Sequence, residues 1–180
     1  MTLYLVRHGL TDYLVEGRSQ GHAPCPLNAV GIEQARKIAP EVAKLKIEYI
    51  ISSDLARTRQ TAEVLNEKLH LDIEYDARIR EKSAGDKTGY LNGTWPNQED
   101  FLANPHKYNA ETWEDVFNRV SAFLADLTAR QIDNVLIVTH GGIVNMLKYC
   151  AKIKKWNPAD TTRDWFHGVE NCSLHFLETH

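Results

Sequence analysis

Three short segments of the sequence bring arginine, histidine and glycine together. They are Arg7-His8-Gly9, Ser53-Asp54-Leu55-Ala56-Arg57 and Thr139-His140-Gly141-Gly142. Arginine presents a planar guanidinium that can bind two phosphate oxygens at once and stays charged at every working pH. A neutral histidine can attack phosphorus and carry the phosphoryl group as a covalent intermediate. The three segments therefore indicate chemistry on a phosphate.

Two histidines allow a division of labour, in which one attacks phosphorus and the other, in its protonated form, stabilises charge. A leaving alkoxide also needs a proton, and Glu81 is the best-placed carboxylic acid because it follows a predicted strand. Asp86 and Glu111 are the alternatives. An acid that donates near neutral pH needs a raised pKa, which burial or a neighbouring phosphate supplies. The other interpretation of Glu81 is a surface ion pair with Arg78, Arg80 or Lys82.

Segments with the pattern of buried strands alternate with amphipathic helical segments along the chain. We expect strands at 2–6, 49–52, 73–75, 134–139 and 172–177, and helices at 29–45, 54–69, 112–130 and 142–153. Asn28 is the expected N-cap of the first long helix, and Pro40 is expected to kink or interrupt it. This alternation predicts an α/β sandwich with a mostly parallel sheet.

Ligands of such sheets bind beyond the carboxyl ends of the strands. Val6, Ser52 and Thr139 end three predicted strands, so the three polar segments should converge on one crevice. Arg57 falls in the first turn of its helix, where free N–H groups and the helix dipole also favour an anion. Residues 80–109 are rich in Gly, Asn, Pro and Lys, which predicts loops with one short helix near 98–103. This composition would permit the segment to move as a lid over the site.

Composition excludes several classes of partner. The chain has 180 residues with 43% hydrophobic and 25% charged side chains, which predicts a single domain over residues 1–180. A net charge of -3 gives no broad positive field for nucleic acid or an acidic membrane, and no apolar run is long enough to span a bilayer. The first residues lack the features of a signal peptide. Three cysteines without metal-ligand spacing favour reduced thiols in a cytoplasmic protein.

The motifs resemble a known family. The segment Leu5-Val6-Arg7-His8-Gly9-Leu10-Thr11 resembles the signature of the histidine phosphatases, also called the phosphoglycerate mutase-like superfamily. Further segments follow the family pattern in the right order: Gly17-Arg18-Ser19-Gln20-Gly21, Gly31-Ile32-Glu33-Gln34-Ala35, Ser52-Ser53-Asp54-Leu55-Ala56-Arg57-Thr58, Val138-Thr139-His140-Gly141-Gly142 and Asn171-Cys172-Ser173-Leu174. The resemblance is to the phosphatase branch, which includes alpha-ribazole phosphatase and broad-specificity phosphatases.

The resemblance implies a three-layer α/β/α sandwich and a role for each matched residue. His8 would be the phosphorylated nucleophile, and Glu81 would protonate the leaving group and later activate water. The phosphoryl group would be bound by Arg7, Arg57 and His140, with the backbone of Gly141 close by. The substrate would be a small phosphorylated molecule, and neither a metal nor a cofactor is implied.

The sequence also departs from the family pattern. Leu10 replaces the usual Glu or Gln, Leu14 replaces a phosphate-contacting Asn, and Asn145 replaces an Arg after the paired glycines. The segment from Lys82 to Gly89 lacks the usual Trp-Glu-Gly. These changes leave the four matched residues of the site intact and leave the substrate open.

Three alternatives to a small-molecule phosphatase remain. A phosphoglycerate mutase would return the phosphoryl group to a sugar acid, but the stretch from Glu81 to His140 contains few basic residues: Lys82, Lys87, Lys107, Arg119 and Arg130. A protein phosphohistidine phosphatase fits the chain length equally well. A non-catalytic module that binds a phosphorylated ligand is the third alternative. The sequence does not predict an oligomeric state.

Some further aromatic and histidine residues have two interpretations. Trp113 recurs with Phe117 and Phe123 at helical spacing, which is typical of a core position. One of Trp95, Trp156 and Trp165 could line the substrate pocket, and His22 and His167 could approach it.

Overall fold

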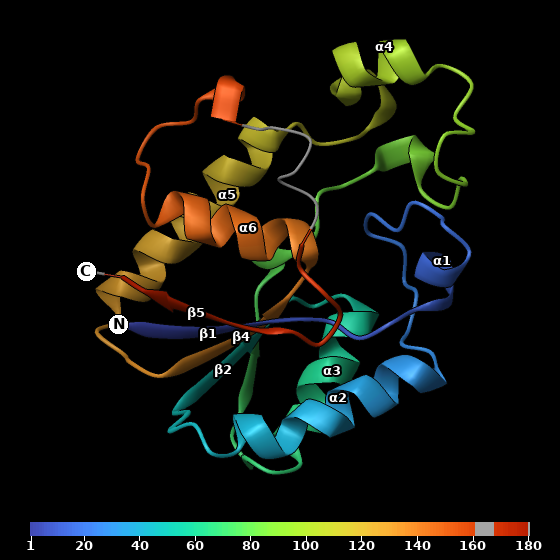
Figure 1. Ribbon diagram of the computed structural model, residues 1–180. Helices are drawn as coiled ribbons and strands as arrows, with labels where there is room; N and C mark the ends of the chain where they lie inside the picture. The colour runs from blue at the N-terminus through green and yellow to red at the C-terminus, as the bar shows by residue number, and fades with distance from the viewer. Residues whose placement is uncertain (161–167, 180) are drawn as a thin grey trace.

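The expected strands pair into one sheet in the computed structural model (Figure 1). The structure describes residues 1–160 and 168–179. Within these residues the sheet has the strand order β3-β2-β4-β1-β5. Every neighbouring pair is parallel except β1 with β5, so the prediction of a mostly parallel sheet is confirmed. The strands are β1 Thr2–Arg7, β2 Tyr49–Ser52, β3 Ile73–Tyr75, β4 Val135–Thr139 and β5 Leu174–Glu178.

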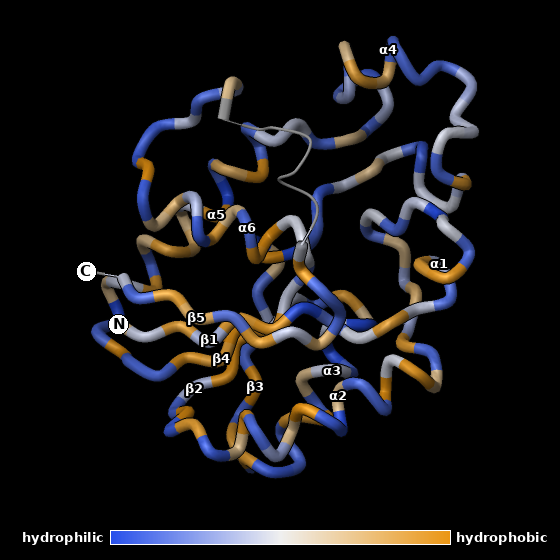
Figure 2. Tube along the Cα trace, viewed as in Figure 1, coloured by the Kyte–Doolittle hydropathy of each residue, from blue (hydrophilic) through white to orange (hydrophobic). Residues whose placement is uncertain are grey.

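Helices cover both faces of this sheet, which gives the expected three layers. In Figure 1, α2 (Ala29–Val42) and α3 (Ala56–Asn66) lie on one face, and α5 (Trp113–Ala129) and α6 (Gly141–Cys150) lie on the other. Each face has its own cluster of buried apolar side chains, and β4, which contributes to both, is buried at every position. Figure 2 shows the apolar residues gathered along these strands. None of the described helices combines the length and the apolar character needed to span a bilayer.

The remaining helical segments of the described residues are short, and one of them, the 3-10 turn that contains Ile79, contributes to the core. They are α1 (Asp12–Val15), α4 (Gln98–Ala103) and four turns of 3-10 helix at Ala77–Ile79, Gly85–Lys87, Pro105–Tyr108 and Pro158–Asp160. Helix α4 confirms the short helix predicted at 98–103. An isolated bridge between Arg18 and Leu91 ties the loop after α1 to the segment 80–109.

The helix boundaries differ from the prediction near Pro40. Of the two outcomes expected at Pro40, a kink or an interruption, the interruption does not occur, because α2 runs through Pro40 and ends at Val42 rather than at residue 45. A proline in the last turn removes only one hydrogen bond of the helix, so the turn tolerates it. At the other end, the prediction of the N-cap is confirmed, because the Asn28 side chain accepts a hydrogen bond from Gly31 N at 2.9 Å.

Two glycines let the loop after β1 pack directly on α2. A Cβ atom at Gly9 would lie 2.4 Å from the Gly31 carbonyl oxygen, and one at Gly31 would lie 2.1 Å from the Leu10 carbonyl oxygen. Both distances are shorter than any tolerated contact, so neither position accepts a side chain without a backbone shift. In addition, Leu10 N donates a hydrogen bond to the side-chain oxygen of Gln34 at 2.8 Å. The loop that carries His8 is therefore fixed by backbone packing.

Candidate active site

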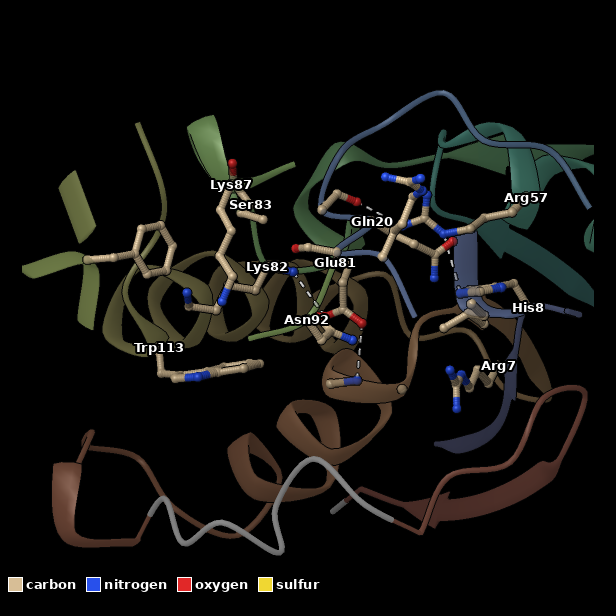
Figure 3. Close-up of a pocket in the computed structure, with 18 residues that line it drawn as sticks. Arg7, His8, Gln20, Arg57, Glu81, Lys82, Ser83, Lys87, Asn92 and Trp113 are labelled. Carbon is tan, nitrogen blue, oxygen red and sulfur yellow. Dashed lines mark hydrogen bonds between the residues drawn. The ribbon is translucent and has the colours of Figure 1, made fainter. Parts of the chain in front are cut away.

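The structure brings the predicted residues together at the carboxyl ends of β1, β2 and β4. A cavity of about 750 Å³ opens there and is lined by Arg7, His8, Arg57, Glu81 and Gly141, among others (Figure 3). His140 lies behind His8, with the centroids of the two rings 5.2 Å apart. The N-terminus of α6 also opens on this cavity, where free N–H groups favour an anion.

Hydrogen bonds fix the tautomer of His8. Its Nδ1 lies 2.7 Å from the Gly9 carbonyl oxygen, which can only accept, so Nδ1 carries the proton and donates. The other ring nitrogen, Nε2, accepts a hydrogen bond from Arg57 Nε at 3.3 Å and therefore has a lone pair (Figure 3). The Asn171 side chain donates to the His8 carbonyl oxygen at 2.8 Å and holds the end of β1. The ring thus turns an unprotonated nitrogen toward the cavity.

Burial keeps both histidines neutral. The side chain of His8 is 2% exposed and that of His140 is 0% exposed. Burial, with the nearby Arg57 charge, lowers the pKa of each imidazole well below its usual value. For His8 this is the form that a nucleophile requires. The prediction that the second histidine is protonated was wrong for the free protein, because desolvation and the Arg57 guanidinium both disfavour a second positive charge at His140.

This burial predicts acid-sensitive folding. Unfolded histidine binds a proton below pH 6.5, whereas folded His8 and His140 do not, so the unfolded state takes up more protons as the pH falls. The stabilisation is complete above pH 6.5 and is lost below it, by about 1.4 kcal/mol per pH unit for each histidine. Urea unfolding at pH 7.5, 6.0 and 5.0 measures this slope. The double variant H8N/H140N should have a shallower slope, and equal slopes would contradict the prediction.

Arg57 is positioned by backbone carbonyls rather than by an acid. It is 0% exposed, and its guanidinium donates to the Gly21 carbonyl oxygen at 2.9 Å and to the Ala23 carbonyl oxygen at 3.3 Å. A buried cation without a carboxylate partner is costly, and burial lowers its pKa. Arg57 therefore retains its positive charge for an anionic ligand.

Two further polar atoms at the cavity have no hydrogen-bond partner within the described part of the chain. One is Arg7 Nε and the other is His140 Nδ1, and both are buried. Their neighbouring atoms are engaged, since Arg7 Nη1 donates to the Val169 carbonyl oxygen and His140 Nε2 lies 2.9 Å from Ser53 Oγ. Buried polar atoms are rarely left unpaired in a native protein, so Arg7 Nε, which can only donate, and His140 Nδ1 are both available to a ligand.

Glu81 enters the cavity from the loop after β3. Its carboxylate accepts hydrogen bonds from two backbone N–H groups, those of Lys82 at 3.0 Å and Gly142 at 3.3 Å (Figure 3). A Cβ atom at Gly142 would lie 2.7 Å from Glu81 Oε1, so the glycine makes room for the acid. The alternative surface ion pairs are not formed, because Arg78 pairs with Asp76 and Asp126, and Arg80 pairs with Asp54.

The two alternative acids are engaged elsewhere. Glu111 pairs with Arg119 at 2.8 Å and accepts from Ser83 N at 2.7 Å. Asp86 is exposed and accepts from the Asn109 side chain at 3.0 Å. Neither carboxylate lines the cavity, whereas Glu81 does, and it is the only acidic residue among the described residues of the lining.

Two residues outside the cavity motifs, His22 and Arg119, hold the Glu81 backbone. The Glu81 carbonyl oxygen accepts from His22 Nε2 at 2.7 Å and from Arg119 Nη2 at 3.1 Å, and Arg119 Nη1 donates to the Arg78 carbonyl oxygen at 2.6 Å. The expectation that His22 approaches the pocket is thus confirmed. Arg119 lies 38 residues from Glu81 on another element, and no local pattern in the sequence connects them.

The far end of the cavity contains residues outside the family motifs: Lys82, Lys87, Asn92, Phe101 and Trp113. The prediction that Trp113 packs on the core is confirmed, and the structure adds that this residue also lines the cavity. Trp95 and Trp156 do not line it, and instead pack with other aromatic rings. Trp165 and His167 lie outside the described residues.

Within the described ranges, no group of three His, Cys, Asp or Glu side chains could hold a metal ion.

Comparison with known proteins identifies the family of this chain. The sequence model of the "Histidine phosphatase superfamily (branch 1)" matches residues 3–180. The "Uncharacterized phosphatase PhoE" of Bacillus subtilis is 36% identical over 146 residues, 79% of this chain and 73% of that protein. The "Probable phosphoglycerate mutase GpmB" of Citrobacter koseri is 35% identical over 150 residues, 78% of this chain and 70% of that protein. The crystal structure of the alpha-ribazole phosphatase from Shigella flexneri is similar with a TM-score of 0.83 and 26% identity, covering 99% of this chain and 90% of that one.

Proposed function

Since the chain belongs to the histidine phosphatase superfamily (branch 1), we propose that it is a phosphomonoesterase that hydrolyses a small phosphorylated substrate through a phosphohistidine on His8, without a metal. The observation that carries the proposal is the state of His8. Its Nδ1 donates to the Gly9 carbonyl oxygen, which leaves the lone pair on Nε2, and burial keeps the ring neutral. A neutral imidazole with its free nitrogen on an arginine-lined cavity is suited to attack phosphorus.

In the first half of the reaction, His8 Nε2 forms a bond to phosphorus as the bond to the ester oxygen breaks. The Glu81 carboxyl group gives its proton to that oxygen, and the alcohol leaves. Arg57, whose Nε now donates to His8 Nε2, turns this donor to a phosphoryl oxygen as the substrate arrives. The unpaired Arg7 Nε supplies a second charged donor, and the fixed guanidinium groups stabilise the charge of the transition state.

His140 contributes as a neutral donor in this scheme. If the Ser53 hydroxyl donates to Nε2, the proton of the imidazole resides on Nδ1, the atom that has no partner in the described structure. Nδ1–H then donates to a phosphoryl oxygen without adding a third positive charge beside Arg7 and Arg57. The N–H groups at the start of α6, next to Gly141, add to the same anion site.

In the second half, water attacks the phosphorus of phosphohistidine. The Glu81 carboxylate accepts a proton from that water, the bond from phosphorus to Nε2 breaks, and inorganic phosphate leaves with His8 neutral again. Protons and charges balance over the two halves, because Glu81 regains the proton that it gave to the alcohol.

Trapping the intermediate tests this function. Brief incubation with a phosphate ester labelled in the phosphoryl group, in excess chelator, should leave label on the protein that acid removes and base does not, as expected for a phosphoramidate. Turnover that stops in chelator, or a label that resists acid, would contradict the proposal. Binding of phosphate without turnover would favour the non-catalytic module.

A phosphoglycerate mutase is the second candidate, because a relative of that name is 35% identical. It would use the same phosphohistidine and pass the phosphoryl group to a sugar acid instead of water. Supplying an acceptor sugar acid to the labelled phosphoenzyme separates the two. Release of label as inorganic phosphate supports the phosphatase, and recovery of label on the acceptor supports the mutase.

A further inference from the structure

The cavity has a second cationic end. In Figure 3, Lys82, Lys87 and Trp113 lie on the opposite side of Glu81 from His8 and Arg7. Given the proposed attack at His8, this side faces the part of the substrate that leaves as the alcohol. Among the described residues that line the cavity, five are cationic, namely Arg7, Arg18, Arg57, Lys82 and Lys87, whereas one, Glu81, is acidic. The excess of positive charge is larger than a phosphoryl group alone requires.

The ammonium group of Lys82 has no partner of opposite charge. Within residues 1–160 and 168–179, Lys82 Nζ forms no hydrogen bond or ion pair, and it lies 5.7 Å from the centre of the Trp113 ring. Burial is the main effect on the pKa of this ammonium and lowers it, the nearby carboxylates of Glu111 and Glu81 raise it, and the charge of Lys87 lowers it. A partly buried cation without a counterion is unfavourable, and a bound anion would relieve it.

The carboxylates nearest to Lys82 are already committed. Glu111 is paired with Arg119, and Asp115 caps α5 through Thr112 and pairs with His106. Both oxygens of Glu81 accept backbone hydrogen bonds. The neighbouring lysine is also open to a ligand, since Lys87 Nζ donates to the neutral side chain of Gln98 at 3.2 Å and lies 5.2 Å from the centre of the Phe101 ring.

Arg18, the remaining cation of the cavity, differs from these lysines. It pairs with Glu16 and donates to the Gly89 carbonyl oxygen, so its charge is compensated within the protein. Arg7 and Arg57 lie at the phosphoryl end beside His8. The uncompensated charge at the alcohol end is therefore that of the two lysines.

We infer that the substrate carries a second anionic group on its alcohol part, bound by Lys82 and Lys87, with Trp113 packing against the carbon chain between the two anions. The inference rests on the proposed function, because it assigns the alcohol end of the cavity from the attack at His8. A carboxylate and a second phosphate share the required chemistry. The ring face of Trp113 supplies apolar surface, and the exclusion of water around it strengthens the charge pair.

Matched substrate pairs test the inference. One pair is 3-phosphoglycerate and glycerol 3-phosphate, which differ by a carboxylate in place of a hydroxymethyl group. The other is ribose 1,5-bisphosphate and ribose 5-phosphate, which differ by the second phosphate. The wild-type protein should prefer the more anionic member of at least one pair by tenfold or more in kcat/KM, and the pair that responds identifies the anion.

Lysine variants connect this preference to the site. Lys82→Met should reduce the preference to threefold or less, and Lys87→Met should reduce it in part. The control Lys44→Met, on the exposed segment after α2, should leave the preference unchanged. If Lys82→Met fails to fold, the salt dependence of the wild-type preference replaces it, since charge attraction at a partly exposed site weakens as salt rises.

Two results would overturn the inference. One is a wild-type protein that hydrolyses both members of each pair equally, and the other is a preference that survives in both lysine variants. Hydrolysis of a plain aryl phosphate, measured alongside, reports on the proposed function separately. If the aryl phosphate is hydrolysed and no pair shows a preference, only the second anion site fails. If nothing is hydrolysed, the proposed function fails with it.

Discussion

Replacement of His8 by asparagine should lower kcat/KM for every phosphate monoester by about 10³- to 10⁵-fold, because it removes the attacking nitrogen. The loss should be as large for aryl phosphates as for alkyl phosphates, since the nucleophile is needed whatever group leaves. Initial rates of phosphate release, together with the label on the protein, measure both consequences. The variant should show no phosphoenzyme.

A matched replacement separates this effect from a general one. His70→Asn changes an exposed histidine at φ 57°, a conformation that asparagine tolerates, so activity and stability should stay near those of the wild type. Circular dichroism and thermal unfolding show whether the His8→Asn protein is folded. A folded His8→Asn variant that retains more than a tenth of the wild-type activity would exclude His8 as the nucleophile.

Replacement of Glu81 by glutamine should slow the hydrolysis of substrates with a poor leaving group much more than that of substrates with a good leaving group. Hydrolysis of an alkyl phosphate should fall by about 10²- to 10⁴-fold, because an alkoxide needs the proton that Glu81 supplies. Hydrolysis of 4-nitrophenyl phosphate should fall much less, since nitrophenolate leaves without protonation. Single-turnover rates of the wild type and the variant on the two substrates measure the difference between these two losses.

The control for this difference between substrates is Asp86→Asn. It removes the negative charge of the exposed alternative acid while keeping the size of the side chain. It should change both rates by less than threefold. A Glu81→Gln protein that slows both substrates equally would indicate that the side chain supports the loop rather than donating a proton. A rate that falls in Asp86→Asn instead would reassign the acid.

The sequence alone was sufficient to predict which residues come together at one end of the cavity. The residues there follow directly after strands β1, β2 and β4, and parallel strands must end at one edge of the sheet. Local sequence also determined the N-cap at Asn28 and the first-turn position of Arg57. These features depend on a few neighbouring residues, which is why pattern analysis could find them.

The protonation state of His140 could not be predicted in this way. It depends on complete burial and on the charge of Arg57, which reaches the site from a different element. The place of Trp113 in the cavity lining was not predicted, for a related reason. Helical spacing assigns a face of α5 to the core, but Trp113 is the first residue of that helix, where the core ends and the cavity begins.

The support of Glu81 by Arg119 required the folded chain. Arg119 reaches two carbonyl oxygens of the loop from the middle of α5, and its own charge is compensated by Glu111. In the sequence it appears as an ordinary charge on an amphipathic helix. The single domain, the cytoplasmic location and the movement of residues 80–109 as a lid stay predictions.

The way in which Glu81 is held has a consequence for how this scaffold can diversify. Its carboxylate contacts the backbone N–H groups of Lys82 and Gly142, and an N–H group is the same whatever side chain follows it. Residue 82 can therefore exchange its charge during evolution or in a designed library without loss of that contact with the acid. Residue 142 has no such freedom, because any side chain there would collide with the carboxylate. With the proposed roles of Lys82 and Glu81, substrate preference and proton transfer can therefore change independently, although the two residues are adjacent in the chain.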